Sequence, residues 1–268
     1  MDNIVIDIED LRKNYSSTQV LRGISFKVKA GEVVGYLGSN GAGKSTTVKI
    51  LCGLIHDFNG KVSILGHDLR NDETNIKYRI GYVPENAEMY EQLTPLEYLE
   101  LVGTLYNLTP ETIAERSAAY LQMFDMTKEQ NERMFSFSKG MKQKIHFISG
   151  LLHNPDIIFL DEPLNGLDAN AVIIVKNIIS KLASEGKTVF YCSHLMDVVE
   201  KVSTRILLLN NGNIVTDGAL DELKELHQAD SLEEIFTKLT NEKQEPRNEN
   251  QETRIESQKL RDARQSPL

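Results

Sequence analysis

The sequence lacks long apolar runs, has few cysteines and carries no surplus of basic charge. No apolar stretch approaches the roughly 18 residues that a membrane-spanning helix needs. The two cysteines, Cys52 and Cys192, stand far apart in apolar stretches, which predicts buried reduced thiols and disfavours a disulfide or a metal pair. The net charge is −9, so the basic footprint of a general nucleic-acid-binding protein is missing and no nucleic-acid partner is expected.

Length and composition allow a sizeable core. The chain has 268 residues, of which 40% are hydrophobic, enough for one large domain or a domain with a subdomain. The start, Met1–Val5, is acidic and lacks the layout of a signal peptide. No internal repeat is apparent. We therefore expect a cytosolic protein that needs a partner for any role at a membrane.

The most informative stretch is the glycine-rich segment 38–45, GSNGAGKS, which fits the phosphate-loop pattern G-x-x-x-x-G-K-[ST]. The apolar run 32–37 before it predicts a buried strand, and residues 46–51 predict the first turns of a helix. Glycines let a backbone wrap around an anion because they accept positive φ, and a helix N-terminus adds partial positive charge. This context favours a nucleoside triphosphate site over a glycine-rich turn without a ligand.

Within this site, the chemistry of the side chains suggests separate roles. Lys44 supplies a point charge for the β- and γ-phosphates, and Ser45 supplies a hydroxyl for Mg²⁺. The other predicted nucleotide contacts come from the loop and the start of the helix: Ser39, Asn40, Gly41, Ala42, Gly43 and Thr46.

A second chemical site is predicted at 159–163, FLDEP. An acidic residue that ends a buried strand in a phosphate-loop enzyme holds Mg²⁺, and Asp161 stands at that place. Glu162 follows it and could polarise an attacking water. Taken alone, Asp-Glu after a strand is more often a solvated loop, but the phosphate loop earlier in the chain favours the catalytic interpretation.

Hydrophobic periodicity predicts alternating strands and helices with a helical insertion. The expected strands are 4–8, 20–29, 32–37, 60–66, 80–84, 157–160, 188–192, 205–209 and 214–216. A helix-rich stretch is expected at 94–153, and further helices at 170–184 and 231–240. The helix after the phosphate loop is expected to carry Val48, Leu51, Cys52 and Leu54 on one side. Residues 241–268 are charged with few aliphatic side chains, which predicts a disordered tail.

Tyr15 lies in a polar stretch between the first two strands. An aromatic side chain on such a loop could stack on a nucleobase. Spacing alone favours an ordinary surface tyrosine.

The ordered set of motifs resembles that of the ATP-binding subunits of ABC transporters over roughly residues 2–240. Tyr15 is similar to the aromatic A-loop residue, and 38–46 to Walker A. Residues 82–85 (YVPE) fall at the Q-loop, and 137–141 (FSKGM) at the LSGGQ signature. Residues 160–163 (LDEP) resemble Walker B with its glutamate, 164–168 (LNGLD) the D-loop, and His194 the switch histidine.

This resemblance implies a fold and a role for each of the motif residues. The fold is an α/β phosphate-loop (RecA-like) core with a mainly parallel sheet and an N-terminal antiparallel β subdomain. The core covers 1–84 and 155–240, and a helical subdomain covers about 85–154. Two subunits pair head to tail, so that Ser138 and Gly140 of one cover ATP on the other. Lys44, Glu162 and His194 carry catalysis; for His194, a place beside a helix N-cap is the alternative.

Departures from the family pattern point to one branch of it. Glu85 stands where many members have glutamine, and its carboxylate can still bind Mg²⁺ or a water. Lys139 and Met141 replace a glycine and the glutamine of the signature, and Lys139 adds positive charge toward the partner's phosphates. These variants resemble the branch paired with ABC-2-type export permeases, including drug-resistance exporters. The segment 231–236 resembles that branch's closing helix.

The sequence thus predicts an ATPase, with ATP and Mg²⁺, that drives a membrane permease by nucleotide-dependent dimerisation at the cytoplasmic face of the membrane. A homodimer is favoured over a heterodimer. The surface 85–98, with Met89, Tyr90 and Leu93 expected to be exposed, would receive a helix of the permease; the alternative is that these three pack the helical subdomain. Two rival functions are a soluble ABC-type ATPase acting on ribosomes or DNA and a weakly hydrolysing regulatory subunit.

Overall fold

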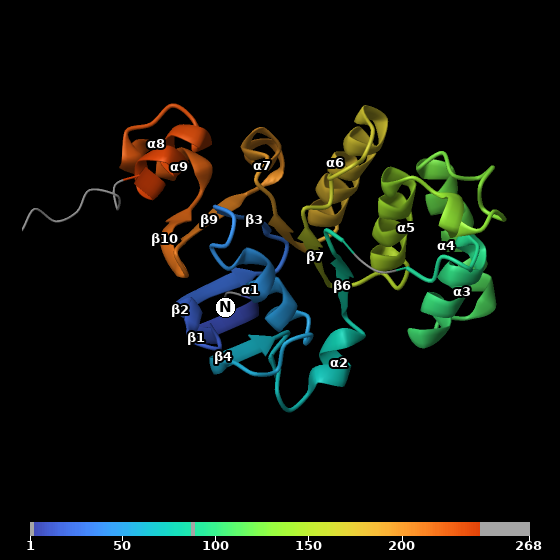
Figure 1. Ribbon diagram of the computed structural model, residues 1–268, viewed down its shortest axis with the longest axis horizontal. Helices are drawn as coiled ribbons and strands as arrows, with labels where there is room; N and C mark the ends of the chain where they lie inside the picture. Colours follow the sequence, from blue (N-terminus) through green and yellow to red (C-terminus); the bar gives the residue numbers. More distant parts are fainter. Residues whose placement is uncertain (1–2, 87–88, 242–268) are drawn as a thin grey trace, which may run out of the picture.

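The computed structural model describes residues 3–86 and 89–241, and its larger sheet has six strands (Figure 1). The strand order is β10-β9-β3-β8-β7-β6, and every neighbouring pair is parallel except β10 and β9. These strands are β3 (Val33–Gly38), β6 (Ile80–Val83), β7 (Ile157–Asp161), β8 (Thr188–Cys192), β9 (Arg205–Asn210) and β10 (Asn213–Gly218). The mainly parallel sheet predicted for the α/β core is confirmed.

A second sheet is antiparallel and has the order β2-β1-β4-β5. Its strands are β1 (Ile4–Tyr15), β2 (Thr18–Lys29), β4 (Asn59–Ile64) and β5 (His67–Asp68). The first strand is longer than predicted, because its pairing with β2 continues past a bulge. At this bulge Asp10 adopts a φ of 50° and the register shifts between Ile8 and Leu11. A bulge of this kind bends a strand without ending its pairing, so the polar break in the sequence does not end the strand.

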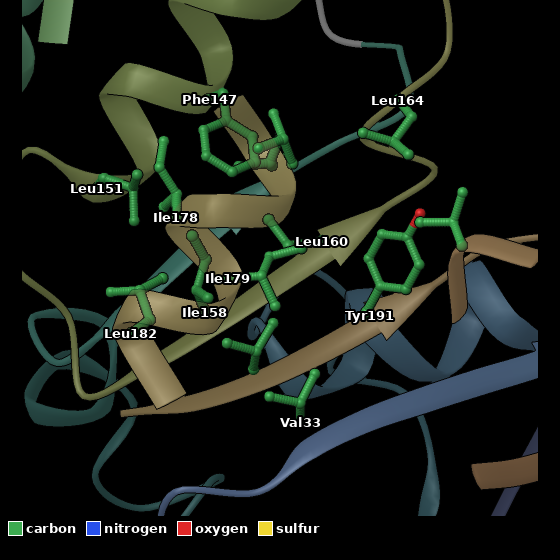
Figure 2. Packing of buried hydrophobic residues seen from close by; sticks show 14 of the residues in the cluster. Val33, Phe147, Leu151, Ile158, Leu160, Leu164, Ile178, Ile179, Leu182 and Tyr191 are labelled. Atoms are coloured by element: carbon green, nitrogen blue, oxygen red, sulfur yellow. The ribbon is translucent and has the colours of Figure 1, made fainter. Parts of the chain in front are cut away.

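Both faces of the five parallel strands are largely buried, which explains their continuous apolar sequences. Successive residues alternate between two hydrophobic clusters, with Val33 and Leu37 in one and Val34 and Tyr36 in the other. Figure 2 shows the first cluster, where side chains of α6 (Ala169–Ser184) and α5 (Lys139–Leu151) pack over β7 and β8. The second cluster joins the sheet to the antiparallel strands and to α1 (Lys44–Leu51).

The described residues between β6 and β7 contain helices and no strand. They form α3 (Pro95–Leu105), α4 (Pro110–Met123), the 3₁₀ turn η1 (Met134–Ser136) and α5, and they lie at one end of the molecule in Figure 1. Thr94 and Glu97 form a capping box at the start of α3, since Thr94 Oγ1 accepts the Glu97 N–H at 3.2 Å and the Glu97 carboxylate accepts the Thr94 N–H at 2.8 Å. The limits 85–154 of a helical subdomain stay a prediction.

The remaining helices are α2 (Glu73–Lys77), α7 (Met196–Val202), α8 (Leu220–His227) and α9 (Leu232–Asn241). The first three are short, and the sequence pattern did not predict them. Ser231 Oγ accepts the Glu234 N–H at the start of α9, but the Glu234 carboxylate accepts from Asp230 instead of Ser231. The helix includes Asn241, the first residue of the predicted tail; the rest of that tail, 242–268, lies outside the described residues.

Two further predictions concern exposure. The placement of Leu54 on the buried side of the first helix is wrong: α1 ends at Leu51 and Leu54 is 53% exposed. Cys52 and Cys192 are both buried free thiols, as predicted. Across residues 3–86 and 89–241, no helix has the length and apolar character needed to cross a bilayer.

Candidate functional site

The phosphate loop connects the end of β3 to the start of α1, as predicted. Gly41 and Gly43 adopt positive φ, at 78° and 114°. A Cβ on Gly43 would also lie 2.7 Å from Leu21 Cδ2, so this position requires glycine. Gly38 needs glycine for another reason, because its φ is ordinary and a Cβ there would lie 2.4 Å from the carbonyl oxygen of Leu209.

Lys44 lies within the loop. Its Nζ donates to the carbonyl oxygens of Gly38 at 2.8 Å and Ser39 at 3.3 Å, and the residue is only 8% exposed. A buried ammonium held by backbone carbonyls is a point charge of fixed position. The backbone N–H groups at the start of α1 add to the positive potential there.

Ser45 and Asp161 converge beneath the loop. Ser45 Oγ donates to Asp161 Oδ1 at 3.2 Å. Burial raises the pKa of Asp161, and the nearby carboxylates of Glu162 and Glu85 raise it further against the opposing effects of Ser45 and Lys44. This excess of negative charge is what a divalent cation would offset.

The donor set fits Mg²⁺ bound together with phosphate. Magnesium in nucleotide sites takes one or two carboxylates and completes its shell with water and phosphate oxygens, and Ser45 and Asp161 supply one hydroxyl and one carboxylate. In the part of the chain that the structure describes, no group of three or more histidine, cysteine, aspartate or glutamate side chains is placed to hold a metal. The protein side chains therefore suit a shared metal–phosphate site and do not form a metal cage.

Glu162 follows Asp161 in an unusual backbone conformation. Its φ is 48°, a left-handed value that costs a non-glycine residue about 1 kcal/mol. The backbone N–H of Glu162 donates to the Cys192 carbonyl at 2.9 Å. Its Oε2 accepts from Ser193 Oγ at 3.2 Å and lies 2.9 Å from His194 Nδ1. Strain of this kind is typical of functional sites.

A cavity of about 570 Å³ brings many of these groups together. It is lined by Val20, Asn40, Gly41, Gly43, Lys44, Ser45, Thr46, Glu85, Glu162 and His194. Ser39, Ala42 and Asp161 are not in its lining. Val20, on β2, was missed, because an apolar strand residue far from the loop in sequence carries no signal for ligand contact.

Tyr15 does not line this cavity. It is the last residue of β1, paired with Thr18 across a two-residue turn, so its predicted place on a loop is wrong. The ring is 47% exposed, and the Lys13 ammonium lies 4.9 Å from its centre. A role in stacking on a base stays a prediction.

The signature residues lie at the start of α5. Ser138 is the N-cap, and its Oγ accepts the Met141 N–H at 3.2 Å. A Cβ on Gly140 would lie 2.4 Å from the carbonyl oxygen of Gly166, so glycine there permits close contact with the D-loop. Lys139 is exposed. Neither Ser138 nor Gly140 lines the cavity of its own subunit.

Gln143, on α5, connects the two acidic loops of the site. The side chain is 3% exposed, and its Nε2 donates to the Pro84 carbonyl at 3.3 Å and to the Pro163 carbonyl at 3.4 Å. These prolines adjoin Glu85 and Glu162 in sequence. The sequence analysis missed Gln143, although a polar residue on the buried face of an amphipathic helix was a usable signal.

A second bond links the same loops. Asn165 Nδ2 donates to Glu85 Oε1 at 3.3 Å, so the predicted Q-loop carboxylate contacts the predicted D-loop. Lys144 of α5 pairs with Asp168 at 2.9 Å, and Asp168 also caps α6. The start of α5, the D-loop and the Glu85 loop thus form one connected unit.

Comparison with known proteins agrees with this geometry. The family model described as ABC transporter matches residues 21–165. The chain belongs to the ABC transporter family. It is an ATP-binding subunit of that family, as the ordered motifs indicated. An uncharacterised ABC transporter ATP-binding protein of Nostoc sp. is 39% identical over 228 residues, which cover 82% of this chain and 68% of the relative.

Two resistance proteins are also similar to this cassette. The linearmycin resistance ATP-binding protein LnrL of Bacillus subtilis is 32% identical over 238 residues, covering 89% of this chain and 76% of that protein. The daunorubicin resistance ATP-binding protein of Streptomyces coeruleorubidus is 30% identical over 224 residues, covering 84% of this chain and 71% of that protein. The likeness to drug-resistance subunits within the family is therefore confirmed.

Solved structures share the fold. An ATP-binding subunit of an ABC transporter superposes with a TM-score of 0.83 at 30% identity, covering 88% of this chain and 99% of that one. A dimeric cassette in a post-hydrolysis state, bound to ADP and phosphate, superposes with a TM-score of 0.74 at 27% identity. The match covers 80% of this chain and 98% of that one.

Proposed function

We propose that this cassette binds MgATP and hydrolyses it to drive an export permease. The observation that carries the proposal is the arrangement at the ends of β3 and β7. Lys44 and the Ser45–Asp161 pair lie beside Glu162, whose carboxylate borders the 570 Å³ cavity. One cavity thus combines groups suited to phosphate, to a cation and to a nucleophilic water.

The loop residues 39–46 would hold the triphosphate. The backbone N–H groups and Lys44 bind the β- and γ-phosphate oxygens, because both present positive charge to the cavity. Ser45 and Asp161 would hold Mg²⁺, with Glu85 acting directly or through a water. Bound Mg²⁺ supplies charge neutralisation between the phosphates.

Glu162 is the proposed general base. Its carboxylate would accept a proton from the water that attacks the γ-phosphate, and His194 would orient Glu162 or contact that phosphate. The 2.9 Å approach of His194 Nδ1 to Glu162 Oε2 supports a joint role. His194 also directly precedes Leu195, the N-cap of α7, so its position is the one that the alternative of a helix N-cap neighbour describes.

The active unit we propose is a head-to-tail dimer, with two identical subunits as the first choice. The Ser138 hydroxyl, the Gly140 backbone and the N-terminus of α5 would cover ATP bound by the partner subunit. Two observations support this: these residues lie outside the cavity of their own subunit, and the related cassette described above is dimeric. Lys139, exposed beside them, would add positive charge.

The permease would dock at a groove between α3 and the end of α1, at the cytoplasmic face of the membrane. The groove has about 310 Å³ and includes Leu54 and Leu105, which are 53% and 66% exposed. Within the surface 85–98, the expected exposure of Met89 and Leu93 is wrong, since both pack against the hydrophobic core, and only Tyr90 of the three is exposed. Export is favoured by the similarity to the two resistance proteins.

The decisive test is Glu162→Gln in the full chain. Removing the base should lower ATP turnover by about 10²–10⁴-fold while ATP binding persists, and the ATP-bound variant should accumulate as a dimer. Phosphate release and size-exclusion chromatography measure both effects. Turnover at the parent rate would exclude Glu162 as the base. Salt-sensitive binding of the parent to ribosomal RNA or DNA would favour the rival role on nucleic acid.

A further inference from the structure

The turn after β8 holds the Glu162 carboxylate through two side chains. Ser193 Oγ donates to Glu162 Oε2 at 3.2 Å, and His194 Nδ1 lies 2.9 Å from the same oxygen. The two residues differ in freedom of movement. The His194 side chain is 55% exposed, whereas Ser193 is only 1% exposed. Ser193 is therefore the fixed donor of the pair.

The orientation of the Ser193 hydroxyl is set by a neighbouring backbone group. The Leu195 N–H donates to Ser193 Oγ at 3.0 Å, which occupies one lone pair of that oxygen. A serine hydroxyl carries a single proton, and Glu162 Oε2 is the acceptor it meets. The start of the turn thus directs one O–H donor at the carboxylate.

Glu162 needs such a support because its backbone is strained. With φ at 48°, the residue adopts a conformation that persists only where its surroundings enforce it. The Cys192 carbonyl fixes the Glu162 N–H at 2.9 Å, and Ser193, the next residue, fixes the side chain. Cys192, which ends β8, and Ser193, which follows it, therefore hold both ends of Glu162.

We propose that Ser193 is a positioning residue for hydrolysis. By engaging Oε2 it leaves Oε1 for the attacking water, since the contacts of Ser193 and His194 are both made to Oε2. This inference rests on the proposed function, in which Glu162 is the base. Ser193 touches neither nucleotide nor metal in this scheme, because it acts through Glu162.

The test compares Ser193→Ala and Ser193→Thr with the parent and with Glu162→Gln. Loss of a hydrogen bond to a charged group should lower the kcat of Ser193→Ala about tenfold or more. The KM for ATP should stay unchanged, and the ATP-bound dimer should accumulate as it does for Glu162→Gln. Ser193→Thr keeps the hydroxyl and should restore most of kcat. Ser184→Ala, an exposed serine at the end of α6, is the matched control.

The outcomes separate the inference from the proposed function. Parent-like kcat in Ser193→Ala, together with an inactive Glu162→Gln, would overturn the positioning role and leave the function standing. A loss of ATP binding and thermal stability that parallels the loss of kcat would mean that Ser193 only builds the turn, and would also overturn it. An equal defect in a normally folded Ser193→Thr would contradict the hydrogen bond as the cause. Full activity of Glu162→Gln would refute the function itself.

Discussion

Replacing Gln143 by leucine should uncouple the two acidic loops of the site. The Gln143 amide donates to the carbonyls of Pro84 and Pro163, each next to a carboxylate of the site. Leucine has a similar volume and fills the buried space, but it offers no donor. Both proline carbonyls then lose their hydrogen bond to α5, while the packing of the side chain at position 143 is kept.

The size of the effect follows from burial. Gln143 is 3% exposed, so water replaces the lost donors poorly. Two hydrogen bonds of about 1 kcal/mol each, with part of the cost of leaving acceptors unpaired, give a loss of roughly 2–4 kcal/mol in the free energy of unfolding. In a domain of this size that lowers Tm by roughly 5–12 °C. The long bonds, 3.3 and 3.4 Å, favour the lower end.

The assay combines thermal unfolding with ATP turnover. Gln143→Leu should lower Tm, and it should lower kcat more than it weakens ATP binding, since the phosphate loop is untouched. Gln122→Leu on α4 makes the same chemical change at an exposed position and should alter neither quantity. A Gln143→Leu protein with parental Tm and kcat would show that α5 does not position the acidic loops.

Two other predictions concern the phosphate loop and acid stability. Lys44→Ala should weaken ATP binding about 10–100-fold, because charge-assisted bonds to phosphate are lost. Lys49→Ala, at an exposed position, is the control. Unchanged ATP affinity of Lys44→Ala, measured by calorimetry, would refute the role of Lys44 in binding phosphate. Burial opposes the charge of Asp156, but bonds from Arg79 and Lys187 outweigh it and lower the pKa of Asp156 below 3.8. The ion pairs therefore stabilise the folded protein fully at pH values above the pKa of Asp156 in the unfolded chain. This stabilisation is lost as the pH falls through the lower pKa of Asp156 in the folded protein. Asp156→Asn should therefore be less stable than the parent by about 0.5–1 kcal/mol at pH 7, and denaturant titrations should show the gap closing below about pH 4; a gap independent of pH would contradict the ion pairs.

The motifs and the strands of the large sheet could be predicted because local sequence determines them. A glycine-rich loop between a buried strand and a helix is one continuous segment, and residues such as Ile157–Leu160 are apolar throughout because both faces of their strand are covered. The capping box at the start of α3 is equally local, since Thr94 and Glu97 are three residues apart and each side chain accepts the other's backbone N–H.

What could not be predicted depends on contacts between distant segments. Gln143 acquires its role from two prolines in other loops, and Val20 lines the cavity only because β2 passes the phosphate loop. The left-handed φ of Glu162 had no signal, since glutamate rarely adopts it. Met89 and Leu93 looked exposed because polar residues surround them in sequence, yet they pack on the helical core.

The burial of both native thiols has a practical consequence for spectroscopy. Cys52 and Cys192 are buried, at 5% and 0% exposed, and burial raises the pKa of each thiol well above its ordinary value. Maleimide dyes that attack surface thiolates should therefore leave them unmodified in the folded protein. A single cysteine introduced at an exposed site, such as Ser184→Cys, can then carry a fluorophore without a cysteine-free background. Energy transfer between two labelled subunits would report their approach in real time.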